Sequence, residues 1–415
     1  MPHQFTAGRA MSAFDQDHSL IVVIEMSLST WLVTGLLPGV ERQPLKKLHP
    51  DPDLLWSLID RRRQECQASG REIARLVVAF EAGRDGFWLA RWLEARGVEA
   101  YVIHSSSVAV SRDRRRAKTD RLDAALLLRV LLGWLRGEAG HCSMAATPSV
   151  EDEDARRPTR ERENLVGKRT RIVNRMKAAF ARLGIRDVNP AQRKAFEKLD
   201  GLRTPEGRVI PPLAMAELRR DIARLRFVEN QIKEIEQQRM VRLDVAKPDE
   251  ERANGMVRLL TRVVGVGVET ADMLAHEIFL RDLRDRRAVA RYAGLTGSPD
   301  ESGSKRRERG LSRAGNPRVR RGMVQLAWRF LVFQKDCALV RWFRARTADA
   351  IGRRRMSLIV AFARKLLVAL WRLAMGSEAP VHNAHCAFGL PKKVSTPVFV
   401  PLPPPARRKV NDQGH

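Results

Sequence analysis

Three short apolar runs near the start of the chain limit the possible folds most. They lie at residues 20–24, 76–80 and 99–104, and helical patterns at 53–72 and 87–96 separate them. Runs of this length bounded by turn residues are typical of buried strands. Strands that alternate with helices through short turns predict an α/β domain whose sheet is at least partly parallel. The apolar run after Ser27, which includes Trp31, either continues the first strand or returns as a hairpin.

The charge of the chain predicts a polyanionic partner. The 415 residues include 76 Lys and Arg against 48 Asp and Glu, a formal net charge of +28. A surface this basic favours nucleic acid or an anionic membrane surface. The two most apolar stretches, at residues 20–40 and 356–375, are interrupted by charged residues, so neither predicts a membrane span. No signal peptide is visible at the N-terminus. We therefore expect a cytoplasmic, nucleoid-associated protein that binds DNA or RNA and no membrane.

The four cysteines give no sign of a disulfide framework or a zinc ribbon, because no two of them form a CxxC pair. His382, His385 and Cys386 form one candidate metal cluster, but without a second pair of ligands we expect no zinc site there.

The rest of the chain is mainly helical. Residues 151–162 look like a charged linker, and apolar residues then recur at helical spacing in 165–183 and again in 218–235. Two long amphipathic helices predict a helical hairpin or a coiled coil, and hence a surface for self-assembly. We expect five parts, namely an N-terminal extension (1–18), the α/β domain (19–150), the linker and long helices (151–250), a mostly helical domain (251–378) and a disordered tail (379–415).

Four acidic residues have positions suited to metal chemistry. Glu25 and Glu81 each follow an apolar strand, and Asp120 and Asp123 are three residues apart, which places both on one face of a helix. Carboxylates that converge repel each other unless a cation neutralises them. Oxygen ligands favour Mg²⁺ or Mn²⁺, and such ions can stabilise an in-line phosphoryl displacement. An acid after a strand is more often a cap or a surface residue, but four such acids on a basic chain favour a metal site.

Several basic segments are candidate nucleic-acid contacts. The positions just before Asp120 form either a phosphate-binding segment or a solvated loop, namely Arg114, Arg115, Arg116 and Lys118. Gly265 and Gly267 form a Gly-x-Gly turn between two helical patterns. Such a turn can bind phosphate in the manner of a helix-hairpin-helix element, although a plain helix-helix turn has the same sequence pattern.

A basic segment rich in serine follows. We expect residues 297–315 to form a loop that leads into a basic helix starting near Asn316. Nearby guanidinium groups or a metal could activate a serine as a nucleophile. On chemistry alone Ser302, Ser304 and Ser312 are hardly distinguishable, and serines that only hydrogen-bond phosphate are the more common case. The expected nucleic-acid contacts here are Lys305, Arg306, Arg307, Arg309, Arg313, Asn316, Arg318, Arg320 and Arg321.

The sequence resembles the DEDD insertion-sequence transposases of the IS110 and IS1111 type, also called bridge-RNA-guided recombinases. The matching motifs occur in family order from residue 20 to about residue 375, at 77–88, 116–123, 169–175, 265–267, 292–295, 301–303 and 310–316.

The resemblance implies an RNase H-like (RuvC-like) N-terminal domain, a coiled coil that drives oligomerisation and a C-terminal transposase domain. It assigns an Mg²⁺-binding tetrad to Glu25, Glu81, Asp120 and Asp123, and a nucleophile to Ser302. Glu25 stands where the family has Asp. Members of the family act as tetramers, in which domains of different subunits complete one site, and use a structured noncoding RNA to pair with donor and target DNA.

We therefore predict a transposase that cuts and rejoins DNA through a phosphoserine intermediate at Ser302. One alternative is a metal-dependent hydrolytic nuclease, for instance a junction resolvase, which needs the acids and water but no serine. A second alternative is a non-catalytic DNA- or RNA-binding protein, for which the charge alone would suffice.

Overall fold

The computed structural model describes residues 14–40, 43–83, 86–108, 120–138, 140–186, 188–192, 199–245, 252–302, 305–311, 315–348 and 352–376. For Ser106, Asp120, Arg353 and residues 298–302 and 305–309 it describes the backbone alone. Predictions for Arg114, Arg115, Arg116, Lys118, Ser304, Ser312, Arg313, the His382 cluster and the tail fall outside the described residues. The chain divides into two compact units, Met1–Glu153 and Asp154–His415, and each is described by itself.

The first unit is built on a six-stranded mixed sheet with the order β3-β2-β1-β4-β5-β6. The strands are β1 (Ser19–Met26), β2 (Trp31–Leu36), β3 (Lys46–Leu48), β4 (Arg75–Glu81), β5 (Glu99–Ile103) and β6 (Met144–Ala145). β1 pairs parallel with β4 and β4 pairs parallel with β5, whereas β1 pairs antiparallel with β2. The prediction of an α/β domain is confirmed, and of the two alternatives after Ser27 the structure has the hairpin.

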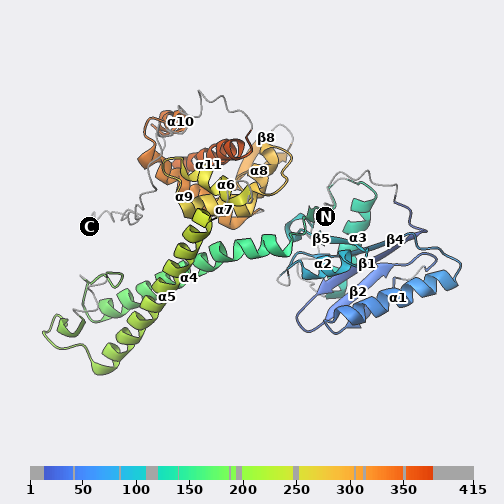
Figure 1. The fold of residues 1–415 in the computed structure, drawn as a ribbon, viewed down its shortest axis with the longest axis horizontal. Coiled ribbons are helices and arrows are strands. Elements are labelled where there is room, and N and C mark those ends of the chain that lie inside the picture. Colours follow the sequence, from blue (N-terminus) through green and yellow to red (C-terminus); the bar gives the residue numbers. More distant parts are fainter. Residues whose placement is uncertain are drawn as a thin grey trace. The chain divides into compact units, whose positions relative to one another are not determined.

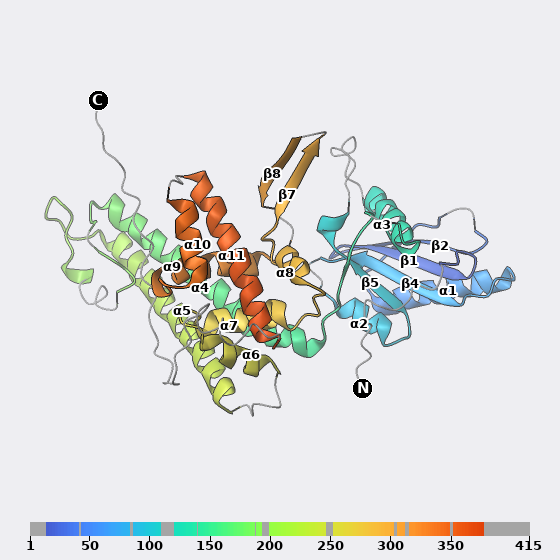
Figure 2. The same cartoon turned by 90° about the horizontal axis from the view of Figure 1, so that it is seen from above.

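Alternation along the strands gives the sheet two apolar faces. Leu20, Val22 and Ile24 pack against α1 (Pro52–Ala68) and α2 (Trp88–Glu94). Ile21 and Val23 point to the other face, where α3 (Asp120–Leu135) covers them. Figure 2 shows α3 and α2 on opposite sides of the sheet. Because successive side chains of a strand alternate between faces, the continuous apolar runs in the sequence reflect a sheet that is buried on both sides.

The second unit begins with two long helices, α4 (Val150–Arg182) and α5 (Pro212–Val245), which run side by side in Figure 1. Their facing sides share a core that includes Met176, Phe180 and Leu225. Two ion pairs one heptad apart, Arg162–Glu236 and Arg169–Glu229, join the helices. The helices are antiparallel, because the residue number of the α5 glutamate falls as that of the α4 arginine rises. The prediction of a linker at residues 151–162 is wrong, since this segment forms the first turns of α4 and even Pro158 lies inside the helix.

The remaining helices of this unit enclose its largest core. They are α6 (Arg252–Thr261), α7 (Val268–Leu274), the π-helix η5 (Ala275–Phe279), α8 (Arg286–Tyr292), α9 (Pro317–Phe333), α10 (Ala338–Thr347) and α11 (Arg353–Ala374). Phe279, Phe330 and Phe362 are fully buried among them. None of the helices in the described part of the chain is long and apolar enough to cross a bilayer.

A β-hairpin replaces the predicted serine loop. Strands β7 (Gly297–Ser302) and β8 (Lys305–Leu311) pair antiparallel, and in Figure 2 they stand clear of the helices. The Gly- and Arg-rich composition suggested a loop, but main-chain hydrogen bonds between two strands can form with almost any side chains. The basic helix starts as predicted, because Asn316 caps α9 by accepting hydrogen bonds from the backbone N–H groups of Arg318 and Val319 at 3.0 and 3.4 Å.

Gly35 in β2 gives a stability test of the first unit. A Cβ at this position would collide with the backbone carbonyl oxygen of Ile21 on β1, and backbone cannot yield as a flexible side chain can. We predict that Gly35→Ala lowers the free energy of unfolding by about 2 kcal/mol, measured by urea denaturation. Gly83→Ala is the control, because the nearest atom to its new Cβ would lie at 3.7 Å. Equal stability of the two variants would contradict the packing argument.

Candidate functional site

Two of the predicted acids lie side by side at one edge of the sheet. Ile24 of β1 is in register with Phe80 of β4, so the parallel pairing places Glu25 next to Glu81 at the carboxyl ends of the two strands. Side chains two residues apart on a strand point to the same face of the sheet. Glu25 therefore shares the face covered by α3 with Val23, and Glu81 shares it with Ala79. Both side chains are half-buried. The strands thus bring two carboxylates to the same edge and the same face.

Helix α3 brings the other two acids toward this edge. Leu127, Leu128 and Leu131 pack onto the sheet, and Asp123 extends the same stripe one turn toward the start of the helix. Near the other end of α3, Arg136 donates a hydrogen bond at 3.4 Å to Gln16, which precedes β1. The last turn of α3 therefore lies near the amino end of β1. The first turn of α3 lies toward the carboxyl end of β1, where Glu25 is. Asp123 is half-buried, and Asp120 is the first residue of α3.

The donor chemistry and placement of these acids suit a hard divalent cation, but the described side chains do not form a finished cage. Within the residues that the structure describes, no three His, Cys, Asp or Glu side chains are grouped as ligands of one ion. The side chain of Asp120 is not among the described ones. Two neighbouring strand ends and one helix start supply carboxylates to one face, and this arrangement fits Mg²⁺ in ligand type.

The structure places the predicted nucleophile at the end of a strand. Ser302 is the last residue of β7 and is in register with Lys305, the first residue of β8. The predicted contacts Lys305, Arg306, Arg307 and Arg309 all lie on β8. Ser302 thus ends β7, whose charged residues are acidic, opposite the first residue of the basic strand β8.

The Gly-x-Gly turn is packed against α9. Gly265 has a φ of +94°, and a Cβ there would touch the Phe330 ring at 3.6 Å. The carbonyl of Val264 accepts a hydrogen bond at 2.9 Å from Gln334. These contacts show a structural role for the turn between α6 and α7. Phosphate binding at Gly265 and Gly267 stays a prediction.

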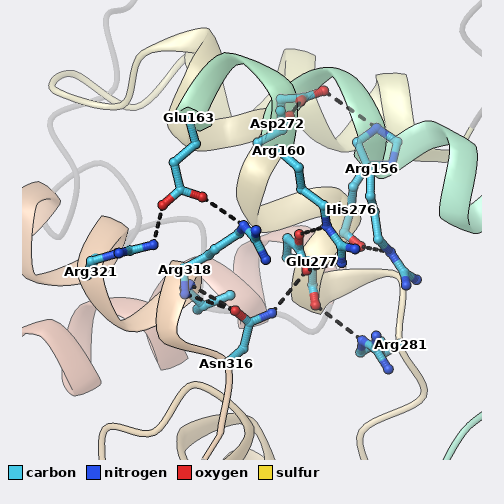
Figure 3. A network of polar contacts seen from close by, with 12 residues as sticks. Arg156, Arg160, Glu163, Asp272, His276, Glu277, Arg281, Asn316, Arg318 and Arg321 are labelled. Carbon is cyan, nitrogen blue, oxygen red and sulfur yellow. Dashed lines mark hydrogen bonds and ion pairs between the residues drawn. The ribbon is translucent and has the colours of Figure 1, made fainter. Parts of the chain in front are cut away.

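Two of the predicted nucleic-acid contacts on α9 are engaged inside their own unit. Arg318 donates to Glu163 of α4 at 2.7 Å, and Arg321 also pairs with Glu163. Figure 3 shows the Glu163 carboxylate between the two guanidinium groups. Arg321 remains largely exposed, whereas Arg318 is about two-thirds buried. These arginines tie α9 to α4, and their contact with nucleic acid stays a prediction, as does that of Arg320 on the same helix.

A buried carboxylate that the sequence analysis missed connects three elements. Glu277 of η5 is 1% exposed and accepts two hydrogen bonds from Arg160 of α4, at 2.8 and 3.1 Å. It also accepts one at 3.0 Å from the side-chain amide of Asn316, the cap of α9 (Figure 3). One sequence signal could have revealed it, namely a glutamate in the mostly apolar segment 271–280, which also contains Asp272 and His276. Because Asn316 follows the serine hairpin, Glu277 helps to fix where that hairpin leaves the helices.

Electrostatics keep Glu277 ionised. Burial by itself would raise the pKa of its carboxyl, but the hydrogen bond and charge of Arg160, together with Asn316 and Arg156, hold the pKa below its usual value. Nearby, burial raises the pKa of Glu269 despite the charges of Arg239 and Arg162. Burial also lowers the pKa of His276, and the charge of Asp272 opposes this shift.

Gly315, which lies just before α9, is a glycine because the backbone approaches α8 closely at this point. Gly315 has a φ of +94°, and a Cβ there would lie 2.6 Å from the carbonyl oxygen of Arg291 and 2.7 Å from that of Tyr292. The next residue, Asn316, donates its backbone N–H to Tyr292 at 2.6 Å. Only glycine fits this position, and it sets the path from β8 into α9.

Comparison with known proteins identifies the class. Residues 49–184 match the family model of DEDD transposases related to IS110, described as a transposase, and residues 257–340 match the model of the transposase IS116/IS110/IS902 family. These segments contain Glu81, Asp120 and Asp123 in the first unit and Ser302 in the second.

One relative matches over most of the chain. The sequence is 39% identical over 365 residues to the candidate transposase y4rJ of Sinorhizobium fredii (strain NBRC 101917 / NGR234), in an alignment that covers 85% of this chain and 91% of that protein. The chain therefore belongs to the IS110/IS116 family of DEDD transposases, and it is a transposase enzyme that acts on DNA. The family membership sets aside the alternative of a non-catalytic binding protein.

Substitution of Glu277 tests the buried network. We predict that Glu277→Gln destabilises the second unit by about 3 kcal/mol, because it leaves the charge of Arg160 without its buried partner. A carboxyl with a lowered pKa stabilises the fold fully above its ordinary value of 4.5, and this contribution is lost as the pH falls through the lower value of the folded state. Urea denaturation between neutral pH and pH 3 should therefore show a weaker acid dependence for the variant. The exposed Glu234→Gln on α5 is the control, and parallel pH profiles for wild type and Glu277→Gln would contradict the assignment.

Proposed function

We propose that this transposase cuts and rejoins DNA strands with two sets of groups, the carboxylates Glu25, Glu81, Asp120 and Asp123, and the hydroxyl of Ser302. The observation that carries the proposal is the register of β1 and β4, which sets Glu25 beside Glu81 on the face covered by α3. Acids at neighbouring parallel strand ends next to a helix start support an RNase H-like nuclease domain. The family models that match both halves of the chain support the same interpretation.

The four carboxylates would hold Mg²⁺, or Mn²⁺ in its place. When bound, such an ion supplies positive charge to the scissile phosphate and lowers the cost of the developing negative charge on its oxygens. The chain itself contributes the fixed strand ends, which hold the carboxylates close together at low conformational cost. Glu25 has one methylene more than the Asp of the family pattern, and it lies within β1, where it is also in register with Leu32 of β2.

Ser302 supplies the nucleophile in this proposal. Its Oγ attacks the phosphorus of the scissile phosphodiester and loses its proton, while the bond from phosphorus to the leaving sugar oxygen breaks and that oxygen takes up a proton. A sugar hydroxyl of the strand to be joined then attacks the phosphoserine and releases Ser302. Each step exchanges one phosphodiester for another, so no external energy source is needed. The basic residues of β8 would neutralise the phosphates on either side.

The proposal includes the assembly and the guide. We propose that the chain works as a homo-oligomer, up to a tetramer, through the α4–α5 helices as a coiled coil. A structured noncoding RNA would direct it to donor and target DNA. The heptad spacing of the Arg–Glu pairs between α4 and α5 supports a coiled-coil geometry. The resemblance in sequence supports the RNA, and the net charge of +28 is compatible with binding both nucleic acids.

A second candidate is a metal-dependent nuclease that uses water as the nucleophile. The match of residues 49–184 to the DEDD family favours it, because that segment contains three of the four acids and no part of the serine hairpin. In this case cleavage would leave no bond between protein and DNA.

Replacement of the nucleophile separates the two candidates. We predict that wild-type protein incubated with end-labelled substrate DNA and Mg²⁺ forms a species that keeps the label through denaturing electrophoresis, and that Ser302→Ala forms none. Ser304→Ala, two residues further along the chain, is the matched control and should keep the adduct. Undiminished adduct with Ser302→Ala would remove this serine from the mechanism, and strand cleavage without any adduct in wild type would favour the hydrolytic nuclease.

Replacement of one acid tests the metal site. We predict that Asp123→Asn slows strand cleavage about 100-fold, since a bound cation contributes several kcal/mol of charge stabilisation. DNA binding, measured without a divalent metal, should be unchanged. Asp60→Asn, an exposed position on α1 of the same unit, is the control. Cleavage by Asp123→Asn at the wild-type rate, with the variant folded by circular dichroism, would exclude Asp123 as a ligand.

A further inference from the structure

An open groove of about 640 Å³ runs along one flank of the α4–α5 hairpin. Its lining comes equally from the two helices, with Lys168, Arg171, Ile172 and Arg175 from α4 and Arg224, Phe227, Val228 and Gln231 from α5. Both sets have the spacing of three, four and seven residues that places side chains on one helix face. The groove is thus a regular feature of the packed pair of helices, and it uses none of the residues assigned to catalysis.

The groove is cationic. Half of its lining residues are Lys or Arg and none is acidic. Elsewhere along the same hairpin, arginines of α4 are matched by glutamates of α5, as in Arg162–Glu236 and Arg169–Glu229. Lys168 and Arg171 of the groove are exposed. A phosphate chain is the polyanion that such a row of cations suits.

A buried carboxylate holds two of these cations in place. Asp221 of α5 is 2% exposed and accepts hydrogen bonds from both Arg175 and Arg224, the latter at 2.8 Å. The hydrogen bond from Arg175 outweighs burial and lowers the pKa of Asp221, so the carboxyl is ionised at neutral pH. One carboxylate shared by two guanidinium groups leaves an excess positive charge. The two arginine side chains are about half exposed, and their bonds to Asp221 orient the guanidinium groups before any ligand arrives.

An aromatic ring lies among the cations. Phe227 is 64% exposed although it is a large apolar side chain, and the buried Ile172 and Val228 lie next to it in the lining. An exposed ring beside guanidinium groups is the combination that binds unpaired strands, because bases stack on the ring while cations contact the phosphates. We propose that this groove binds a single, unpaired nucleic-acid strand, with a base on Phe227 and phosphates on Lys168, Arg171, Arg175 and Arg224.

Two other occupants fit less well. A second copy of the chain, paired through a two-fold axis, would bring the same cations face to face. A duplex keeps its bases stacked within the helix and offers no open base face to Phe227. An unpaired strand satisfies both the charge and the ring.

The experiment uses the full-length chain and fluorescence anisotropy at raised salt, where general attraction to a basic surface is screened. The probes are labelled unstructured oligonucleotides of RNA and of DNA with the same sequence, and the corresponding DNA duplex. We expect Phe227→Ala to weaken binding of a single strand about tenfold and to leave duplex binding unchanged. The double variant Lys168→Ala, Arg171→Ala should flatten the dependence of log affinity on log salt by about 0.7 per removed cation.

Matched controls lie on the same helices. Leu213→Ala removes an exposed apolar side chain of α5, and Lys177→Ala removes an exposed lysine of α4, and neither residue lines the groove. Both should bind as wild type. The RNA and DNA probes distinguish which kind of strand the groove prefers, and a loss with either supports the proposal.

Three results would overturn it: single-strand affinity unaffected by Phe227→Ala, equal losses for the groove and control variants, or a change of oligomeric state by light scattering in place of a change in binding. Asp123→Asn and Ser302→Ala should bind the single strand normally. A negative result for strand binding in the groove therefore does not contradict the catalytic proposal. A negative result for catalysis does not contradict strand binding in the groove.

Discussion

The parallel pairing of β1 with β4 is the constraint on which the proposed chemistry depends. Parallel strands end at the same edge of a sheet, and the observed register gives both strands an acid at that edge. Alternation then selects the face, because Ile21, Val23, Val77 and Ala79 all pack beneath α3. A shift of one residue in this register would turn one carboxylate to the face covered by α1 and α2. The apolar packing of the sheet therefore also determines the position of the carboxylates.

Charge has a different role in the second unit. Its arginines form internal pairs with acids of other helices, such as Arg160 with Glu277 and Arg318 with Glu163. Pairs of this kind add little net stability when both partners are present, but they restrict which helices can meet. Glu277 also holds Asn316, so the start of α9 and the exit of the serine hairpin are fixed through one buried group. A large positive net charge is thus compatible with a basic surface and with a polar interior that is specifically paired.

The helical hairpin combines both uses of charge. At Arg162 and Arg169 each arginine of α4 pairs with a glutamate of α5, so the charges neutralise each other. Along the groove, Asp221 pairs with two arginines and leaves positive charge in excess beside Phe227. The same pair of helices can therefore align itself on one side and present a binding surface on another.

Much of the architecture could be predicted from local pattern. The apolar runs that end at Glu25 and Glu81 predicted buried strands, the stripes around Ile172 and Ile222 predicted two long helices, and the Asn316-Pro pair predicted the start of α9. Prediction from local pattern failed where a charged segment was compatible with more than one backbone conformation. Residues 151–162 remain helical because the buried and half-buried arginines of this segment have partners on other helices. Residues 297–302 and 305–311 pair as strands because main-chain hydrogen bonds need no particular side chains.

The sequence by itself indicated most of the elements, the family, and the candidate acids and serine, because these depend on neighbouring residues and on residue chemistry. The tertiary structure alone decided which acids lie side by side, that Glu277 joins α4, η5 and α9, and that Arg175 and Arg224 share Asp221. Apart from the neighbours Asp221 and Arg224, such contacts join residues 39 to 117 positions apart. They depend on how helices and strands pack, and the periodicity of one segment carries no information about the segment that it will meet.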